Sequence, residues 1–204
     1  MSYRFRLSAV LCVSLVLLYG NGLSADTIHV PVDQAAIDAA SDGDEVVVAP
    51  GTYYETINFN GKAITLRSSS DNPADTIIDA NGSGTVVTCN SGETAATVLQ
   101  GFTLTGGNST VGGGMLNDQA SPTITSCTFS GNTADYSGGG MFNVESSPTI
   151  TNCTFSDNTA DGGGGMYNNP NSSPTVTSCT FSGNTATAYG GGMFNYEACP
   201  TVTN

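Results

Sequence analysis

Hydrophobic and polar residues alternate in short runs through the second half of the chain, and the same pattern returns at a fixed interval. Residues 121–143 read SPTITSCTFSGNTADYSGGGMFN, and closely similar stretches begin at Ser147 and Ser173. Alternation with a period of two is typical of β-strands, whereas helical periodicity is absent. The many glycines and β-branched threonines also disfavour helix. The pattern therefore predicts short strands arranged in repeated units.

The interval between these units is nearly constant. Four prolines are spaced 26 residues apart, at Pro122, Pro148, Pro174 and Pro200. Four methionines recur at intervals of 25 to 27 residues, at Met115, Met141, Met166 and Met193. The small differences in spacing place the insertions in loops. A repeat of this length is typical of solenoids and propellers.

Each unit reads as three short strands joined by corners. Cys127 and Phe129 share one side of a strand, because side chains two residues apart point to the same face. The odd interval back to Ile124 requires a bend near residues 125–126. The glycines at 138–140 are expected to supply a flexible turn.

A single unit buries too few apolar side chains to offset the conformational entropy of ordering its backbone. Stacked units gain strand pairing with neighbours about 4.8 Å away. We therefore expect an all-β parallel β-helix solenoid with about 25–26 residues per regular coil. Like residues would stack in inward columns: Ile124/Ile150/Val176, Cys127/Cys153/Cys179 and Phe129/Phe155/Phe181. Asn132, Asn158 and Asn184 fall at a corner, where their amides can bond along the stack.

The cysteine column has two readings: unpaired core thiols, which we favour, or a hidden disulfide. A zinc site is disfavoured because the chain has no CxxC pair and only one histidine, His29. No metal site and no cofactor are predicted.

The N-terminal half is less regular. A short amphipathic helix over Val32–Ala40 is expected to cover the open edge of the first coil, whose backbone groups would otherwise be unpaired. Strands are expected at Val46–Val48, Ile57–Phe59, Ile64–Leu66, Ile77–Ile78 and Val86–Val87. Residues 98–108 resemble the later repeats and are expected to form an early, divergent coil.

These features divide the chain into three parts. Residues 26–111 would hold the cap and irregular coils, and residues 112–204 the regular repeats. Asn204 stands just before the next expected CTF, so we expect a fragment that stops within a coil and continues into further coils.

The first 25 residues have the order of a secretory signal peptide. Arg4 and Arg6 precede the apolar run LSAVLCVSLVLLYG, and NGLSA follows it, with cleavage expected after Ala25. The run is shorter than the roughly 20 apolar residues of a membrane span. Export to the extracellular space or outer cell surface is therefore predicted, with a retained anchor as the alternative.

Charge narrows the choice of partners. All 17 acidic residues lie after residue 25, where the only Lys or Arg residues are Lys62 and Arg67. Nucleic acids and anionic membranes are disfavoured, because both require clustered cations. Ca²⁺ would be tolerated, although no specific calcium motif is present.

Two families resemble parts of the sequence. The FxxN phrases at 129–132, 155–158 and 181–184 alternate with GGGM, and this alternation resembles the repeats of bacterial polymorphic outer membrane proteins. The segment AIDAASDGDEVVVAPGTYYETINFNGKAITLRS is similar to the opening of pectin-lyase-like right-handed β-helix proteins. The resemblance implies a right-handed parallel β-helix, secreted or displayed on a cell surface, often for adhesion or carbohydrate contact. No segment matches the catalytic residues of pectin methylesterases.

Carboxylates offer the remaining enzymatic candidates. Asp135 and Asp161, one coil apart, are expected about 5 Å apart, as in a retaining glycosidase or a calcium site. Glu145 and Glu197, two coils apart, are expected about 9.6 Å apart, near the upper limit for an inverting pair. Exposed acids in a repeat array also align by chance, so catalysis by either pair is the less favoured reading.

An outward row of apolar side chains offers a binding candidate. Each member follows one of the repeated methionines: Leu116, Phe142, Tyr167 and Phe194. Aromatic faces are suited to partner proteins or sugar rings. In the alternative reading, overlying loops that include Tyr136, Tyr189 and Tyr196 cover the row and extend the core.

The sequence thus favours a non-enzymatic extracellular or cell-surface module for adhesion, surface display or glycan contact, with a glycan or surface protein as partner. The alternative is a fragment of a polysaccharide-degrading enzyme, a lyase or glycoside hydrolase, whose active coils lie beyond Asn204. A polyuronate lyase active site within these residues is disfavoured, because no basic residue follows Arg67.

Overall fold

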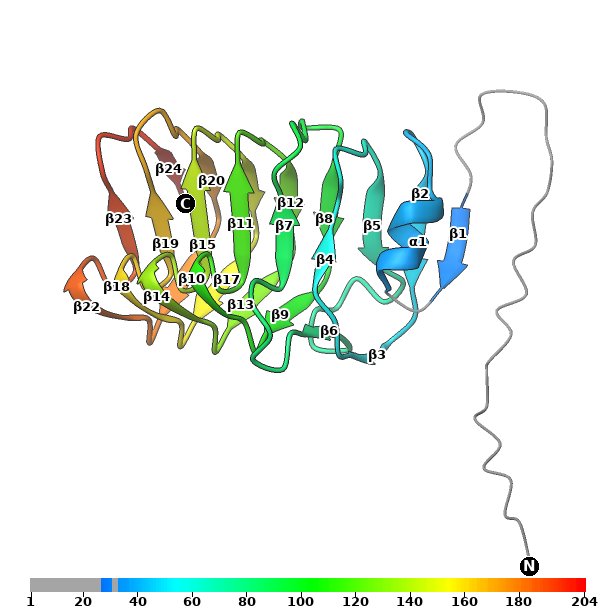
Figure 1. The fold of residues 1–204 in the computed structure, drawn as a ribbon, viewed down its shortest axis with the longest axis horizontal. Helices are drawn as coiled ribbons and strands as arrows, with labels where there is room; N and C mark the ends of the chain where they lie inside the picture. The colour runs from blue at the N-terminus through cyan, green and yellow to red at the C-terminus, as the bar shows by residue number, and fades with distance from the viewer. Residues whose placement is uncertain (1–26, 31–32) are drawn as a thin grey trace, which may run out of the picture.

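The computed structural model describes residues 27–30 and 33–204, and in these ranges the chain winds into stacked coils of short parallel strands (Figure 1). The predicted signal peptide lies outside the described residues. The strands of successive coils form four sheets, which we call A to D. The fold is a right-handed parallel β-helix of about six coils with almost no helix. The repeat predicted the parallel β-helix, and the family resemblance implied its right-handedness.

Sheets A and B form two walls of the solenoid. Sheet A contains β1 (Thr27–Val30), β2 (Glu45–Val48), β5 (Thr65–Ser68), β8 (Val98–Gln100), β12 (Thr123–Thr125), β16 (Thr149–Thr151), β20 (Thr175–Thr177) and β24 (Thr201–Thr203). Sheet B contains β3 (Gly51–Tyr53), β6 (Thr76–Asp79), β9 (Thr103–Thr105), β13 (Thr128–Ser130), β17 (Thr154–Ser156) and β21 (Thr180–Ser182).

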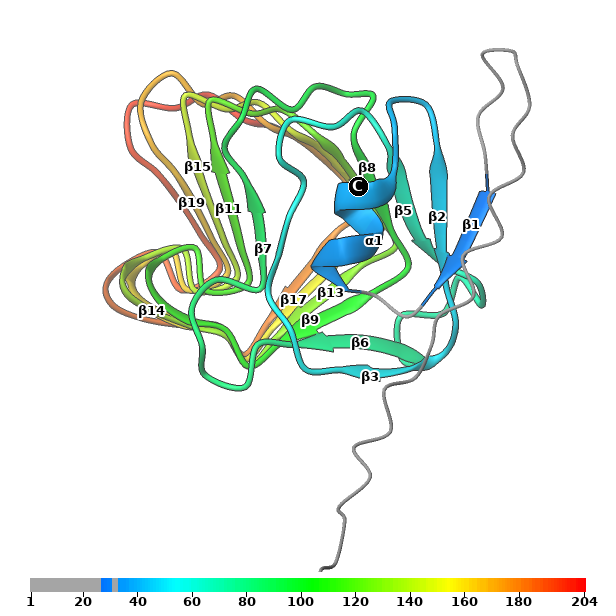
Figure 2. The same ribbon diagram turned by 45° about the vertical axis from the view of Figure 1, so that its right-hand side comes forward.

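Sheets C and D form the opposite side. Sheet C contains β4 (Ile57–Asn58), β7 (Val87–Cys89), β11 (Met115–Asp118), β15 (Met141–Val144), β19 (Met166–Asn168) and β23 (Met193–Asn195). Sheet D contains β10 (Asn108–Val111), β14 (Thr133–Ser137), β18 (Thr159–Gly162) and β22 (Thr185–Tyr189). Figure 2 shows sheet D as a narrow ribbon that projects from the solenoid beside sheet C.

The expectation of three strands per unit was wrong, because regular coils contain four. The segment TADYS, read as part of a corner, forms β14, and Thr133 pairs in register with Thr159 of the next coil. Ala134 is buried while Thr133 and Asp135 are exposed, so the segment does alternate. The small alanine side chain conceals this alternation in the sequence.

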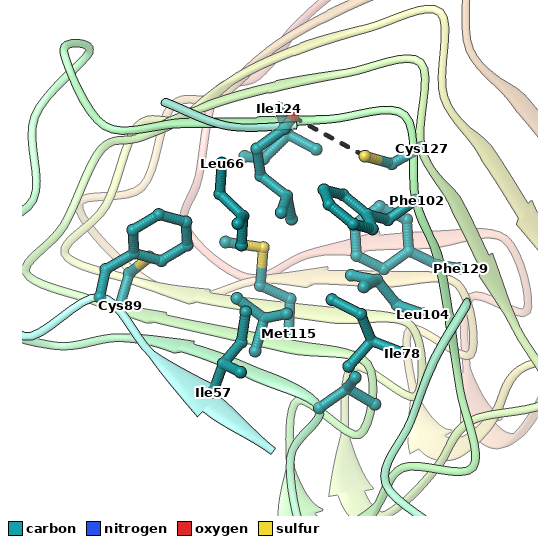
Figure 3. Close-up of a cluster of buried hydrophobic side chains, with 14 of the residues drawn as sticks. Ile57, Leu66, Ile78, Cys89, Phe102, Leu104, Met115, Ile124, Cys127 and Phe129 are labelled. Carbon is teal, nitrogen blue, oxygen red and sulfur yellow. Dashed lines mark hydrogen bonds between the residues drawn. The ribbon is translucent and has the colours of Figure 1, made fainter. Parts of the chain in front are cut away.

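The predicted inward columns are confirmed. Phe129 stacks on Phe155 with ring centroids 4.6 Å apart, and Phe155 stacks on Phe181 at 4.7 Å. Figure 3 shows Ile57, Met115 and Phe129 pointing into a shared core between the walls. The core is therefore continuous from the irregular coils into the regular ones. Residues 98–108 form an early coil, as expected, since β8 and β9 pair with β12 and β13.

The cysteines of the column are all free thiols. Cys127 and Cys153 are buried, whereas Cys179 is half-buried in the last coils. The backbone N–H of Cys153 donates to Sγ of Cys179 at 3.4 Å. Unpaired core thiols, the favoured reading, are the arrangement found.

Two corners in each regular coil depend on different features of the backbone. Ser126 has φ +52°, which supplies the predicted bend between sheets A and B. The glycines at 138–140, predicted to form a flexible turn, are instead buried and hydrogen-bonded, with Gly140 N–H donating to Gly164 O at 3.0 Å. A Cβ at Gly140 would overlap the carbonyl oxygen of Gly165 and meet Phe155 Cδ1 at 3.0 Å. Glycine is therefore required there by close backbone packing.

Two columns of buried asparagines run along the coils. The predicted corner column is confirmed: Asn132 Nδ2 donates to Asn158 Oδ1 at 3.1 Å, and Asn158 Nδ2 to Asn184 Oδ1 at 2.9 Å. A second column joins Asn117, Asn143, Asn168 and Asn195 through Nδ2-to-Oδ1 bonds of 2.7–2.8 Å. Among the described residues, Asn117 Oδ1 is the one buried side-chain oxygen or nitrogen atom without a hydrogen-bond partner.

The N-terminal end is covered as expected by a helix, α1 (Gln34–Ala39), shorter than the predicted Val32–Ala40. Asp33 caps it by accepting a bond from Ala36 N–H, and Ile37 is buried against the first coil. Lys62 Nζ donates to the carbonyl oxygens of Ile37, Asp38 and Ala40 at 2.5–2.7 Å. This cation stabilises the C-terminal end of the helix.

Candidate ligand-binding face

The predicted outward row is a continuous feature of sheet C. Strand register places Leu116 beside Phe142, Phe142 beside Tyr167, and Tyr167 beside Phe194. These four residues, which we call the aromatic row, face away from the core because their neighbours Met115, Met141, Met166 and Met193 point inward. The structure thus brings all four predicted binding residues together.

The rings in the row contact one another at an angle. Phe142 and Tyr167 have centroids 5.5 Å apart and an interplanar angle of 37°, while Tyr167 and Phe194 are separated by 5.2 Å at 51°. Tyr189 of β22 also stacks on Phe194, at 5.2 Å and 27°. Such offset pairs are favourable arrangements for aromatic rings.

Sheet D covers part of the row. A Cβ at Gly162 in β18 would lie 3.1 Å from Tyr167 Cε2, so the ribbon packs closely on that ring. Phe142 is only 9% exposed, and the other three members are half-buried. The row itself is therefore partly an extension of the core.

Three tyrosines beside the row form its exposed surface. Tyr136 is 63% exposed, Tyr189 62% and Tyr196 49%. Sequence reasoning assigned them only to covering loops, yet all three residues are exposed to solvent, and Tyr136 and Tyr189 lie in the strands β14 and β22. Burial raises the pKa of Tyr167, and the nearby Tyr196 and Tyr189 raise it further, which places Tyr167, Tyr189 and Tyr196 close together. The exposed part of the face is rich in aromatic rings, and Asp135 and Glu197 adjoin Tyr136 and Tyr196 in the chain.

The four acidic candidates are exposed on sheet D and at the corner after sheet C. Asp135 and Asp161 are exposed on neighbouring strands of sheet D, and Asp161 accepts a hydrogen bond from the Thr187 hydroxyl. Glu145 and Glu197 are exposed at the corner after sheet C, with φ of +48° and +50°. Both glutamates share this left-handed corner conformation in their coils. Within the described ranges, no three His, Cys, Asp or Glu side chains gather as a group that could hold a metal ion.

A second feature was not predicted from sequence. An open cavity of about 540 Å³, which we call the polar cavity, lies beside α1 and the first strands of sheet C. Its lining residues are Gln34, Thr56, Ile57, Asn58, Asn60, Ser83, Thr85 and Thr88. They come from irregular coils that share no repeated motif, so only the fold brings them together.

Within residues 27–30 and 33–204, no helix is long and apolar enough to span a lipid bilayer. No curated protein and no solved structure matches the chain. Residues 54–204 match the family model described as a right handed beta helix region. The chain therefore belongs to the right-handed β-helix family, in agreement with its stacked parallel strands.

Proposed function

We propose that this protein is a non-enzymatic, extracellular or cell-surface binding module whose aromatic face contacts a neutral glycan. The observation that carries the proposal is the gathering of Tyr136, Tyr189 and Tyr196 beside the aromatic row. Of the five large hydrophobic side chains most exposed in the described chain, three lie on this one face. Rings that present a flat apolar side and a polar hydroxyl suit sugar units, which combine C–H faces with hydroxyl edges.

Charge selects the class of glycan. The chain carries 17 acidic residues and a net charge of −13, so a uronate polymer would be repelled. The two basic side chains after residue 25 are both engaged away from the face. Lys62 binds the carbonyl oxygens at the end of α1, and Arg67 pairs with Glu45 at 2.5 Å. A neutral glycan avoids both the repulsion and the need for a cation.

The test measures binding of three neutral hexasaccharides, cellohexaose, laminarihexaose and chitohexaose, by isothermal titration calorimetry. The variant Tyr136→Ser/Tyr189→Ser/Tyr196→Ser is expected to weaken binding about ten-fold or more, because stacking surface is lost. Tyr54→Ser is the matched control, since Tyr54 is 69% exposed but lies between β3 and β4, at the opposite end of the strand order from β19 and β23.

Two results would contradict the proposal. Equal binding by the triple variant would remove the aromatic face as the site. Release of shortened sugars from the hexasaccharides, lost on Asp135→Asn or Glu145→Gln, would favour the polysaccharide-degrading alternative.

A further inference from the structure

The polar cavity has a wall that is fixed by its own hydrogen bonds. Gln34 Oε1 accepts from Asn58 N–H at 2.7 Å, and Gln34 Nε2 donates to Asn58 O at 2.9 Å. The Asn58 side chain in turn accepts from Asn60 N–H at 2.9 Å and donates to Asn90 Oδ1 at 3.2 Å. These hydrogen bonds join α1 to β4 and fix the positions of the Gln34 and Asn58 side chains in the cavity wall.

Three hydroxyl groups of the lining are left for a ligand. The side chains of Thr56, Ser83 and Thr88 make no hydrogen bond to any residue that the structure describes. Each hydroxyl can both donate and accept. A rigid wall with uncommitted hydroxyls is a favourable arrangement for recognising another hydroxylated molecule, because little ordering is required on binding.

The lining also sets the charge of the ligand. None of the described residues that line the cavity is charged, and its volume of about 540 Å³ falls within the range of roughly 300–1,000 Å³ of small-molecule sites. Asp38 lies just behind the wall, where it accepts from Gln34 Nε2 at 2.8 Å and Asn60 Nδ2 at 3.2 Å. An anionic ligand is disfavoured there, and an uncharged hydroxylated ligand is favoured.

The cavity is aligned with the aromatic row. Asn58 pairs in register with Thr88, and Thr88 pairs with Leu116, the first member of the row. Both features therefore belong to one outward column on sheet C that runs from β4 to β23. Successive positions in such a column are about 4.8 Å apart. A linear ligand lying along the solenoid axis would reach from the cavity onto the rings.

We propose that the polar cavity is a second subsite, which binds the hydroxyl groups of one sugar unit while other units of the same neutral glycan contact the aromatic face. The inference rests on the proposed function for the identity of the ligand. It adds the location of a second contact and the direction of the glycan along sheet C. The hydroxyl groups of one sugar unit are bound at the α1 end, and other units contact the aromatic rings toward β23.

The experiment compares two variants with the same three neutral hexasaccharides. Thr56→Val/Ser83→Ala/Thr88→Val removes the free hydroxyls and leaves the Gln34–Asn58 contacts unchanged. Its matched control, Thr149→Val/Thr175→Val/Ser182→Ala, removes three exposed hydroxyls from sheets A and B. Far-UV circular dichroism establishes that both variants retain the fold. The cavity variant is expected to lose about ten-fold in affinity for a hexasaccharide and the control less than about two-fold.

The outcomes separate this inference from the proposed function. Unchanged affinity in the cavity variant, together with loss in the tyrosine variant, overturns the second subsite alone. Loss in the cavity variant with unchanged affinity in the tyrosine variant supports the subsite and overturns the aromatic face. Absence of binding by the unmodified protein to all three hexasaccharides overturns both. Equal loss in the cavity variant and its control also overturns the subsite.

Discussion

At the scale of single residues, the buried asparagine column on sheet C links successive coils through side-chain hydrogen bonds. Each amide donates through Nδ2 to Oδ1 of the next coil, so an interior member serves both neighbours. Asn117 stands at the end of the column, and its Oδ1 has no hydrogen-bond partner among the described residues. In register, its neighbour on the other side is Cys89, whose thiol is at best a weak donor.

This asymmetry predicts unequal costs for the same substitution. Asn143→Ala leaves Asn117 Nδ2 and Asn168 Oδ1 unpaired, at about 1–3 kcal/mol each. Asn117→Ala leaves only Asn143 Oδ1 unpaired and removes an atom that already lacked a partner. Urea unfolding should therefore show Asn143→Ala to be less stable than Asn117→Ala by about 2–6 kcal/mol. Equal stabilities would mean that the amide bonds contribute nothing net.

The cysteine column predicts a pH-dependent reactivity. The hydrogen bond with Cys153 lowers the pKa of Cys179 to about 7, while hydrogen bonds with both flanking thiols raise that of Cys153 well above its usual value. The thiolate is the form that alkylates. Because Cys179 is also half-buried rather than enclosed, its labelling by iodoacetamide should rise as pH passes through about 7. Mass spectrometry should find Cys127 and Cys153 unlabelled until urea is added, and labelling of Cys153 in the folded protein would contradict the assignment.

At the scale of elements, the glycine runs fix how sheet D meets sheet C. Gly140→Ala places a methyl group against the carbonyl oxygen of Gly165 and the ring of Phe155. Gly192 occupies the same place in the last complete run, but there the nearest atom to an added Cβ is Phe181 Cβ at 3.6 Å, an ordinary contact. Gly140→Ala should therefore lower the thermal midpoint by several degrees, and Gly192→Ala should leave it almost unchanged. A similar loss in both would show that glycine is needed for conformation and not for space.

The sequence pattern was sufficient to predict those strands in which large buried side chains alternate with small or polar exposed ones. The TIT, CTF and MFN stretches became strands with the expected inward residues, because Ile124, Phe129 and Met141 mark the buried side clearly. The fourth strand was missed because Ala134 is too small to mark a buried side. The glycines at 138–140 were predicted to give a flexible turn, because glycine-rich sequence indicates backbone flexibility. Only the packed structure reveals that there is no room for a Cβ at Gly140.

The aromatic row could be predicted from the sequence, whereas the polar cavity could not. Repetition made the aromatic row visible, because each member follows a repeated methionine. The polar cavity has no such signal. Its residues lie on α1, β4, β7 and the turns beside the two strands, and their proximity depends on coils of unequal length.

At the scale of the whole molecule, stability is expected to be a sum over contacts between neighbouring coils. Deleting residues 147–172 joins Ser146 to Ser173 and removes one full repeat, so β15 can pair with β23 as β19 does now. The shortened protein should keep its β-sheet circular dichroism and unfold with a smaller m-value, because less surface is buried. Deleting only residues 147–159 removes part of a coil and should prevent folding. Equal behaviour of the two deletions would contradict the register.

The constant register between coils also has a consequence for changes in the length of the protein. Where consecutive segments of a protein are nearly identical, the insertion or deletion of one repeat length leaves every remaining strand with an equivalent neighbour. Such a change adds or removes a whole coil, and the altered protein keeps the same strand pairing and the same fold. A change of one whole repeat lengthens or shortens the outward column by one position, about 4.8 Å, while the remaining strands keep their pairing.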